Sequence, residues 1–286
     1  MDQKIIDLYD EFTHGGMSRR HFLERLAVVA GSTVAALALL PVLENNYAFA
    51  QTIADGDSRL TTGRVEYDAG GAKIAGYLAR PVGGRKHPAV LVIHENRGLN
   101  PHIEDVARRL AVEGFLALAP DLLSAAGGTP ADPDEAAKMI GALNAGETLA
   151  RVAAAVPFLA RHAESTGKVG VVGFCWGGGL VNELSAAGTS LNAAVAYYGL
   201  QIPAAEVPKI SAPLLLHYGS LDQRINAGID AYEAALKANN KTYEKYMYEG
   251  ANHAFNNDTT AARYNKEAAT LAWSRTIAFL KKNLGA

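Results

Sequence analysis

The sequence has one cysteine, Cys175, in 286 residues. A single thiol cannot form an intrachain disulfide, and it excludes metal sites built from several cysteines. Net charge is also nearly absent, since 27 Lys and Arg residues stand against 29 Asp and Glu residues. A nearly neutral protein has no electrostatic attraction to a polyanion. We therefore expect no nucleic acid and no membrane as partners of the folded domain. No His-Glu-x-x-His spacing occurs, so a metal site is not indicated either.

Low-complexity composition is lacking as well. Apolar residues make up 49% of the chain and charged residues 20%, which excludes a disordered tail and a collagen-like repeat. A chain of this length can bury roughly three quarters of the surface that it exposes when unfolded. One large hydrophobic core is therefore feasible.

The first fifty residues have the three parts of an export signal. Arg19 and Arg20 precede an uncharged run over 26–43, and Ala48-Phe49-Ala50 follows. The paired arginines, with Phe-Leu after them, resemble the twin-arginine signal that exports folded proteins. We therefore expect residues 1–50 to be a signal peptide cleaved after Ala50, the twin-arginine machinery to be a partner, and the mature chain to be periplasmic. The alternative is an uncleaved membrane anchor, because the uncharged run is borderline in length for a span.

The remaining chain, residues 51–286, alternates between strand-like and helix-like segments. Short apolar runs, typical of strands buried on both faces, are followed by stretches with apolar residues at helical spacing. We predict a single α/β domain with a mostly parallel central sheet and helices on both faces. The expected strands cover 64–68, 73–79, 89–94, 115–119, 169–173, 193–197, 213–218 and 243–248, and the expected helices cover 101–113, 134–144, 147–162, 176–187, 225–238 and 260–282.

The segment Gly173-Phe-Cys175-Trp-Gly177 has the pattern of a nucleophile elbow, with cysteine in the place of the usual serine. A β-branched run leads into it and a helix-like stretch follows. The flanking glycines leave room for a tight turn in a strained backbone conformation. Such a turn exposes the sulfur at the carboxyl edge of the sheet. It also directs the backbone amide of Trp176 toward a developing oxyanion. The alternative is a phosphate-binding junction in which Cys175 is a buried small residue.

Two later strand ends supply partners for this cysteine. An elbow nucleophile is followed in the chain by an acid and then by a histidine. Asp222 comes after the apolar run 213–218, and His253 comes after the run 243–248. Each interval is about one βα unit, so the three side chains can converge. We expect Asp222 to orient His253 and His253 to remove the thiol proton.

Other residues near strand ends have simpler interpretations. Asp121 precedes the cysteine in the chain and is predicted to cap a turn. His217 lies inside an apolar run and is predicted to be a core histidine. His94 and His102 are too few and too isolated to indicate zinc.

Three ordered motifs, Gly-Phe-Cys-Trp-Gly-Gly, Gly-Ser-Leu-Asp and Asn-His-Ala-Phe, resemble the dienelactone hydrolase (carboxymethylenebutenolidase) family of α/β-hydrolases. The resemblance covers 74–284. It implies an eight-stranded α/β-hydrolase-like sheet, a Cys–His–Asp triad and no cofactor. It also implies that Glu95 pairs with the resting cysteine and that the amides of Asn96 and Trp176 form the oxyanion hole. Arg97 is the remaining cation that could bind substrate.

Two positions depart from this family. Its members hold a substrate carboxylate with a serine after the histidine and an arginine further on, where this chain has Ala254 and Asn257. A neutral pair cannot make a charge-assisted contact, so we expect neutral substrates to be preferred. The resulting hypothesis is a hydrolase that cleaves a small carboxylic ester or lactone through a thioester on Cys175. The alternatives are a non-catalytic binding relative and an acyltransferase that uses the same thioester.

Overall fold

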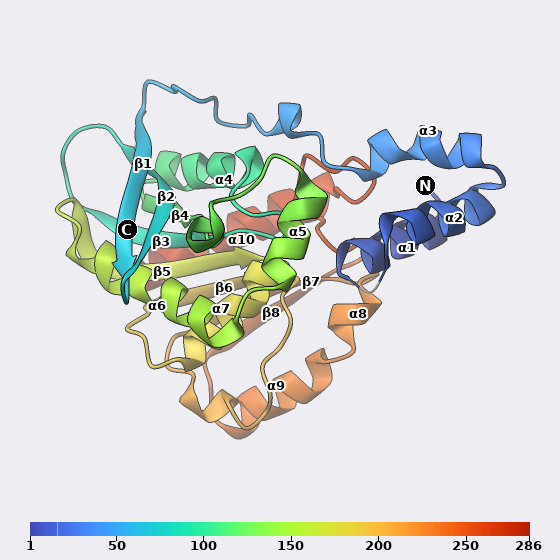
Figure 1. Cartoon of the computed structure of the whole chain (residues 1–286). Helices are drawn as coiled ribbons and strands as arrows, with labels where there is room; N and C mark the ends of the chain where they lie inside the picture. The colour runs from blue at the N-terminus through green and yellow to red at the C-terminus, as the bar shows by residue number, and fades with distance from the viewer. Residues whose placement is uncertain (16) are drawn as a thin grey trace.

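A computed structural model describes residues 1–15 and 17–286 of the chain. Its centre is an eight-stranded sheet with the strand order β1-β2-β4-β3-β5-β6-β7-β8 (Figure 1). The pairs β1–β2 and β2–β4 are antiparallel, and all other neighbours are parallel. The predicted fold class is therefore confirmed. The strands are β1 (Leu60–Ala69), β2 (Ala72–Pro81), β3 (His87–Ile93), β4 (Leu116–Pro120), β5 (Ser165–Phe174), β6 (Ala193–Tyr197), β7 (Leu214–Gly219) and β8 (Tyr243–Tyr248).

Helices cover both faces of this sheet, and the alternation of apolar side chains along β3 explains why. Leu91 and Ile93 point into a core shared with α6, α7 and α9, whereas Val90 and Val92 point into a core shared with α4 and α10. Successive residues of a strand face opposite sides, so a strand that is apolar at every position needs cover on both. The helices of the domain are α4 (Pro101–Val112), α5 (Pro133–Gly141), α6 (Ala145–Arg161), α7 (Trp176–Ala186), α8 (Gln223–Asn226), α9 (Ile229–Ala238) and α10 (Lys266–Leu284), with short 3-10 turns at Ser124–Ala126 and Val207–Lys209.

The structure changes two of the predicted helices. The expected helix over 225–238 is divided at Gly228 into α8 and α9, because glycine is a poor helix former. The expected helix over 260–282 begins later, at Lys266. The side chain of Asn265 caps its first turn by accepting a hydrogen bond from the backbone N–H of Ala268 at 3.1 Å.

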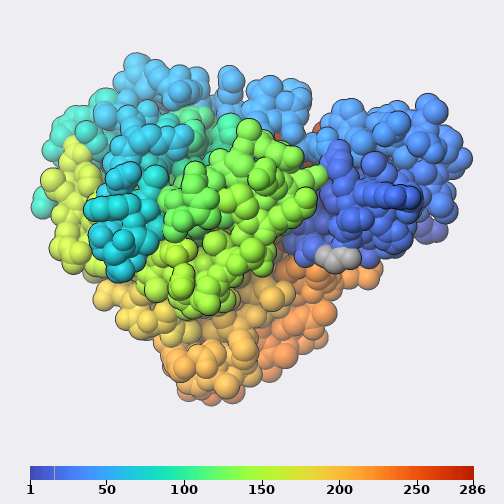
Figure 2. All heavy atoms as spheres, viewed as in Figure 1, coloured from blue at the N-terminus to red at the C-terminus, as the bar shows by residue number. Residues whose placement is uncertain are grey.

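Residues 1–50, which the sequence predicts to be a signal, form a helical segment beside the domain. Its elements are α1 (Gln3–Thr13), α2 (Arg19–Ala30), α3 (Thr33–Leu43) and a 3-10 turn at Tyr47–Phe49. In Figures 1 and 2 this segment is the blue lobe beside the carboxyl ends of the strands, with α1 nearest to the domain. The lobe has a small core of its own, made by Ile5, Leu8, Tyr9, Phe22, Leu26, Ala36 and Leu43.

Membrane-spanning potential is confined to this lobe in the described part of the chain. No single helix among the described residues has both the length and the apolar character needed to cross a bilayer. By length and composition alone, Arg19–Ala30 together with Thr33–Phe49 qualifies as a pair, bent by 110°.

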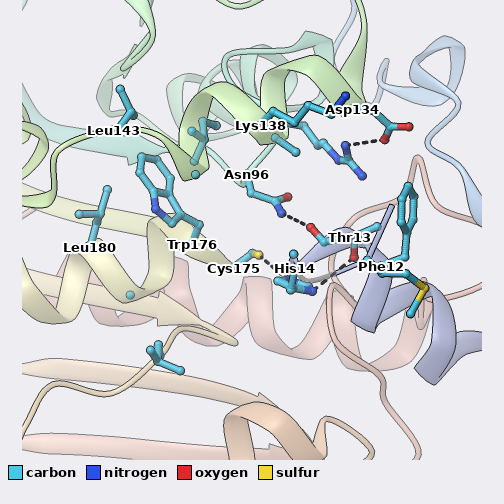
Figure 3. A pocket seen from close by; sticks show the side chains of 18 of the residues that line it. Phe12, Thr13, His14, Asn96, Asp134, Lys138, Leu143, Cys175, Trp176 and Leu180 are labelled. Atoms are coloured by element: carbon cyan, nitrogen blue, oxygen red, sulfur yellow. Dashed lines mark hydrogen bonds and ion pairs between the residues drawn. The ribbon is translucent and has the colours of Figure 1, made fainter. Parts of the chain in front are cut away.

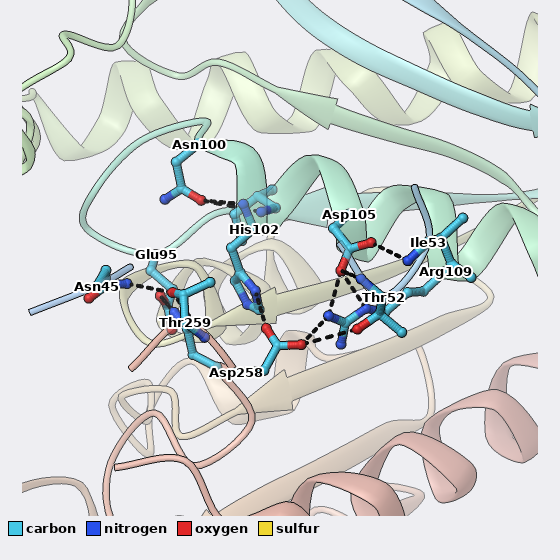
Figure 4. Close-up of polar contacts among 12 residues, drawn as sticks. Asn45, Thr52, Ile53, Glu95, Asn100, His102, Asp105, Arg109, Asp258 and Thr259 are labelled. Carbon is cyan, nitrogen blue, oxygen red and sulfur yellow. Dashed lines mark hydrogen bonds and ion pairs between the residues drawn. The ribbon is translucent and has the colours of Figure 1, made fainter. Parts of the chain in front are cut away.

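A polar cluster on α4 fixes the stretch that connects this lobe to β1 (Figure 4). The backbone N–H of Ile53 donates to Asp105 Oδ1 at 2.8 Å. Arg109 bridges Asp105 and Asp258, and His102 Nδ1 lies 3.1 Å from Asp258 Oδ1. Burial would raise the pKa of Asp258, but the contacts with His102 and Arg109 lower it to about 2. His102 therefore belongs to a structural ion-pair cluster.

Candidate active site

β5 leads into α7 through Cys175 alone, which confirms the strand–turn–helix geometry of the elbow. Cys175 has φ +56° and ψ −117°, a conformation that non-glycine residues rarely adopt. A Cβ atom on Gly173 would lie 2.3 Å from the carbonyl oxygen of Gly177, and one on Gly177 would lie 2.4 Å from that of His94. Only glycine fits at these two positions, so the sequence pattern follows from backbone packing.

Asp222 and His253 meet at the same edge of the sheet. Asp222 follows β7 and caps α8, where Oδ1 accepts a hydrogen bond from the N–H of Ile225 at 3.2 Å. Its Oδ2 lies 2.5 Å from His253 Nδ1. Both side chains are buried, and His253 Nε2 has no hydrogen-bond partner in the described part of the chain. A ring nitrogen of His253 lies within 4.8 Å of the sulfur of Cys175. The structure thus brings the three predicted side chains together.

A fourth side chain reaches this group from α1 and the turn after it. His14 Nε2 lies 3.2 Å from Cys175 Sγ, as the dashed line in Figure 3 shows. The ring of His14 also stands edge-on to that of His253, with the centroids 4.6 Å apart and an interplanar angle of 86°. In this structure the sulfur therefore contacts a histidine of the N-terminal segment.

Asp10, one helical turn earlier, holds His14 in this position. His14 Nδ1 lies 2.8 Å from the carbonyl oxygen of Asp10 and 3.3 Å from its Oδ1. Burial lowers the pKa of His14, but the charge of Cys175 and the hydrogen bond to Asp10 outweigh burial and raise it. Burial raises the pKa of Asp10, but the neighbouring His253 and His14 outweigh it and hold that pKa far below its usual range. A second histidine–carboxylate pair therefore faces the thiol.

Polar contacts fasten α1 to the domain around this pair. Asp10 lies 3.5 Å from Arg224 Nε and 3.5 Å from Arg263 Nη1. The carbonyl oxygen of Thr13 accepts a hydrogen bond from Asn96 Nδ2 at 2.6 Å (Figure 3). The carboxylate of Asp10 is thus shared by two arginines of the domain.

Glu95 differs from its expected role, because it is not the partner of the sulfur. Its Oε2 accepts from Asn257 Nδ2 at 2.7 Å and its Oε1 accepts from Tyr198 Oη at 3.4 Å. Asn257 stands where the resemblance places an arginine, and its amide donates to the carboxylate of Glu95. The sulfur of Cys175 contacts His14 instead. The expected pairing of Glu95 with the resting Cys175 is therefore absent among the described residues.

The other expected site residues line the edge of the cavity. Trp176 is the first residue of α7, and its ring stacks on His94 with the centroids 5.4 Å apart. In the described part of the chain, the backbone N–H groups of Trp176 and Asn96 donate no hydrogen bond to a loop or turn carbonyl. Arg97 is buried, and its Nη1 lies 2.9 Å from Asp134 Oδ1. The charge of Arg97 is therefore already paired.

Two residues that the sequence assigned to structural roles have those roles. His217 contacts Thr276 Oγ1 at 3.1 Å and the hydroxyl of Tyr248 at 2.9 Å, and burial lowers its pKa to about 3. Asp121 caps the next turn, where Oδ1 accepts from the backbone N–H of Leu123 at 3.0 Å. Both predictions are confirmed.

A cavity of about 790 Å³ opens in front of the sulfur (Figure 3). Leu143, Trp176 and Leu180 give it an apolar wall on the domain side, and Phe12 closes it on the side of the N-terminal segment. Lys138 and Arg224 add positive charge to its lining. A small organic molecule fits this volume and this mixture of surfaces.

A match to a known protein family identifies the class of protein to which this site belongs. The family model described as "Dienelactone hydrolase family" matches residues 74–284. The chain belongs to the dienelactone hydrolase family. Membership places it among hydrolases that act on lactones or esters. A second family model, described as YqhI-like, matches residues 1–31, the part that carries His14.

Individual relatives agree with this family. A protein of Methylorubrum extorquens, provisionally named carboxymethylenebutenolidase, is 34% identical over 88% of this chain and 91% of its own length. A Saccharolobus solfataricus protein with the same provisional name is 34% identical over 76% of this chain and 96% of its own length.

Solved structures show the same fold. A Klebsiella pneumoniae protein provisionally named dienelactone hydrolase has 31% identity and a TM-score of 0.71, over 78% of this chain and 99% of its own. A dienelactone hydrolase-like promiscuous phosphotriesterase from metagenomic libraries has 25% identity and a TM-score of 0.72, over 80% of this chain and all of its own.

Reasoning from sequence missed His14 and Asp10. Residues 1–50 were expected to be a cleaved signal, so neither side chain had a place in the expected site. The signal that could have revealed the packing of α1 is the amphipathic pattern of residues 5–12.

Proposed function

We propose that the chain hydrolyses a small carboxylic ester or lactone through a thioester on Cys175, with His253 as general base and Asp222 as the residue that orients it. The contact between Asp222 Oδ2 and His253 Nδ1 carries this proposal. With its proton on Nδ1, the neutral imidazole has a free lone pair on Nε2, and a general base requires such a lone pair.

In the first half of the reaction, His253 Nε2 takes the thiol proton as the sulfur attacks the carbonyl carbon. The backbone N–H groups of Trp176 and Asn96 stabilise the oxyanion of the tetrahedral intermediate. The carbon–oxygen bond to the leaving group then breaks, and the departing oxygen takes the proton from His253. The product of this half is an alcohol, or the opened lactone still attached through its acyl end, and a thioester.

In the second half, water attacks the thioester carbon while His253 accepts one of its protons. The second tetrahedral intermediate releases the carboxylic acid, and the sulfur leaves and recovers the proton from His253. With the N-terminal segment in place, His14 contacts the sulfur. We infer that turnover requires this segment to move away or to be removed.

A mass-spectrometric trapping experiment tests the mechanism. After brief exposure to p-nitrophenyl esters, wild type and His14→Ala should carry one acyl group on Cys175, with a matching burst of p-nitrophenol. Cys175→Ala should lose about 1,000-fold or more of turnover, because an elbow nucleophile has no substitute. Its melting temperature should stay close to that of wild type.

The outcomes separate the alternatives. Near wild-type turnover in Cys175→Ala would show that the mechanism is wrong. Binding without any adduct or turnover would favour a non-catalytic relative. Transfer of the acyl group to an added alcohol in place of water would favour an acyltransferase.

We also propose that the chain is exported by the twin-arginine machinery and works in the periplasm, with an uncleaved anchor as the alternative. The paired arginines at the start of α2 support this proposal, because Arg20 is highly exposed and available to a receptor. The preference for neutral substrates, expected from Ala254 and Asn257, stays a prediction.

A further inference from the structure

Three potential metal ligands converge at the cysteine, and one of them comes from outside the family domain. Cys175, His253 and His14 each offer one ligand atom, and these atoms all lie within 4.8 Å of one another. His253 is 4% exposed, and its Nε2 is buried without a hydrogen-bond partner in the described part of the chain. The sulfur itself is buried as well. An unpartnered imidazole nitrogen therefore faces a thiol and a second imidazole.

Each histidine is held in the tautomer that a metal ion needs. Nδ1 of His253 contacts the carboxylate of Asp222, and Nδ1 of His14 contacts the carbonyl and carboxylate oxygens of Asp10. A proton on each Nδ1 leaves a lone pair on each Nε2. Metal-binding histidines usually have an oxygen acceptor behind the ring in this way.

The set of ligands selects a kind of ion. One thiolate and two imidazoles suit a borderline-soft divalent cation such as Zn²⁺ and leave a fourth position open toward the cavity. Such a cation would be balanced by the thiolate together with the carboxylates of Asp10 and Asp222. Hard cations such as Mg²⁺ prefer all-oxygen ligands and are disfavoured here.

The geometry points to a Zn²⁺ site formed by His14 Nε2, Cys175 Sγ and His253 Nε2 in the chain that retains its N-terminal segment. Binding replaces the thiol proton, which passes to solvent, and forms three bonds to the metal. The ion binds both Cys175 Sγ and His253 Nε2, so the metal-bound chain has neither a free nucleophile nor a free base and is inactive as a hydrolase. The site uses two residues of the proposed function, but the binding itself does not require that function to be correct.

Co²⁺ reports on this site without any substrate. The full-length chain, freed of metal by a chelator, is titrated with Co²⁺, and thiolate-to-cobalt absorption in the near ultraviolet is recorded. Displacement by Zn²⁺ gives its affinity. We expect one ion per chain, a charge-transfer band that is lost in Cys175→Ser, and a Zn²⁺ affinity reduced by about 100-fold or more in His14→Ala. Loss of an outer-shell residue already costs about 10- to 100-fold, and loss of a ligand costs more.

Two further variants keep the test decisive. His14→Gln preserves the volume of the side chain and should lose affinity in the same way, whereas His21→Ala changes an exposed histidine of the same segment and should bind like wild type. Equal Zn²⁺ affinity in wild type and both His14 variants would overturn the proposal, as would a site without the thiolate band. Failure of ester hydrolysis alone would leave the Co²⁺ result unchanged and would count against the proposed function only.

Discussion

His217 shows at the scale of one residue how burial determines protonation. The ring lies inside β7 with both nitrogens in contact with hydroxyl groups, those of Thr276 and Tyr248. Burial lowers its pKa to about 3, whereas a histidine in the unfolded chain titrates near 6.5. Between these values the unfolded chain binds a proton that the native chain does not. Stability should therefore fall as the pH falls below about 6.5.

We predict that this one histidine lowers the free energy of unfolding by about 2 kcal/mol as the pH falls from 7 to 5. Urea unfolding of wild type and His217→Gln at several pH values measures the effect. The variant should lose less free energy of unfolding over this interval, whatever its stability at pH 7. The exposed His21, changed to Gln, is the control and should leave the wild-type pH dependence intact. Parallel curves for wild type and His217→Gln would contradict the prediction.

The residues that could be predicted are those whose neighbours in sequence specify their geometry. Gly173 and Gly177 flank a cysteine after an apolar run, and a Cβ atom at either position would lie within 2.5 Å of a backbone carbonyl oxygen, so both must be glycine. Asp222 could be placed because it comes three residues after the end of a buried strand, β7. The hydrogen bond from Asn257 to Glu95 could not be foreseen, since these residues lie 162 positions apart.

Among the elements, α1 is the one whose position most affects the site. It is joined to the domain by Asp10, which sits between Arg224 and Arg263, and by Asn96, which donates to the carbonyl oxygen of Thr13. These contacts are polar, so loss of a charged group should weaken the docking of α1. Cys175 is the sole cysteine, which makes its alkylation a direct measure of this docking.

We predict that Asp10→Ala increases the rate of Cys175 alkylation by iodoacetamide about 10- to 100-fold. The change removes the contacts of the Asp10 carboxylate with His14, Arg224 and Arg263. A 10- to 100-fold change corresponds to a loss of about 1.4–2.7 kcal/mol in the free energy of docking. Asp7→Ala, on the exposed side of the same helix, should react like wild type. An unchanged rate in Asp10→Ala would show that α1 is held by other contacts.

The strands were more predictable than the helix boundaries for a physical reason. Strands β6 and β8 have the predicted limits, and the others differ by a few residues, because buried runs are bounded where polar residues begin. The start of α10 was misplaced because Thr260 and its neighbours form turns closed by tertiary contacts before Asn265 caps the helix. No local pattern distinguishes such turns from a first helical turn.

At the scale of the whole molecule, the N-terminal lobe combines a signal-like sequence pattern with docking against the hydrolase domain. Its first 31 residues match a family model of their own, and the pattern of its charges and apolar run predicts an export signal. Arg19 contacts Glu44 and Asp134 at 2.8 Å each, so this arginine also fastens the lobe to the domain. The sequence could predict the signal-like pattern. It could not predict the docking, which depends on residues of the domain far away in the chain.

We predict that changing Arg19 and Arg20 to lysine stops export in a bacterium with a twin-arginine pathway. Lysine keeps the charge but not the planar guanidinium that distinguishes the paired-arginine motif. Cell fractionation and N-terminal sequencing should find wild type in the periplasm, cut after Ala50, and the variant in the cytoplasm at full length. A Lys4→Arg variant is the control. Periplasmic accumulation of the double-lysine chain would disprove the twin-arginine interpretation.

The apolar wall of the cavity has an optical consequence. The chain has two tryptophans, and one of them, Trp176, is half-buried in that wall against the ring of His94. The other, Trp273, lies on α10 and packs against a core cluster of the domain. In a Trp273→Phe chain, the sole indole emitter would therefore stand beside the reactive sulfur. Its fluorescence would report acylation of Cys175, binding of a cation or departure of α1 in real time, without any added dye.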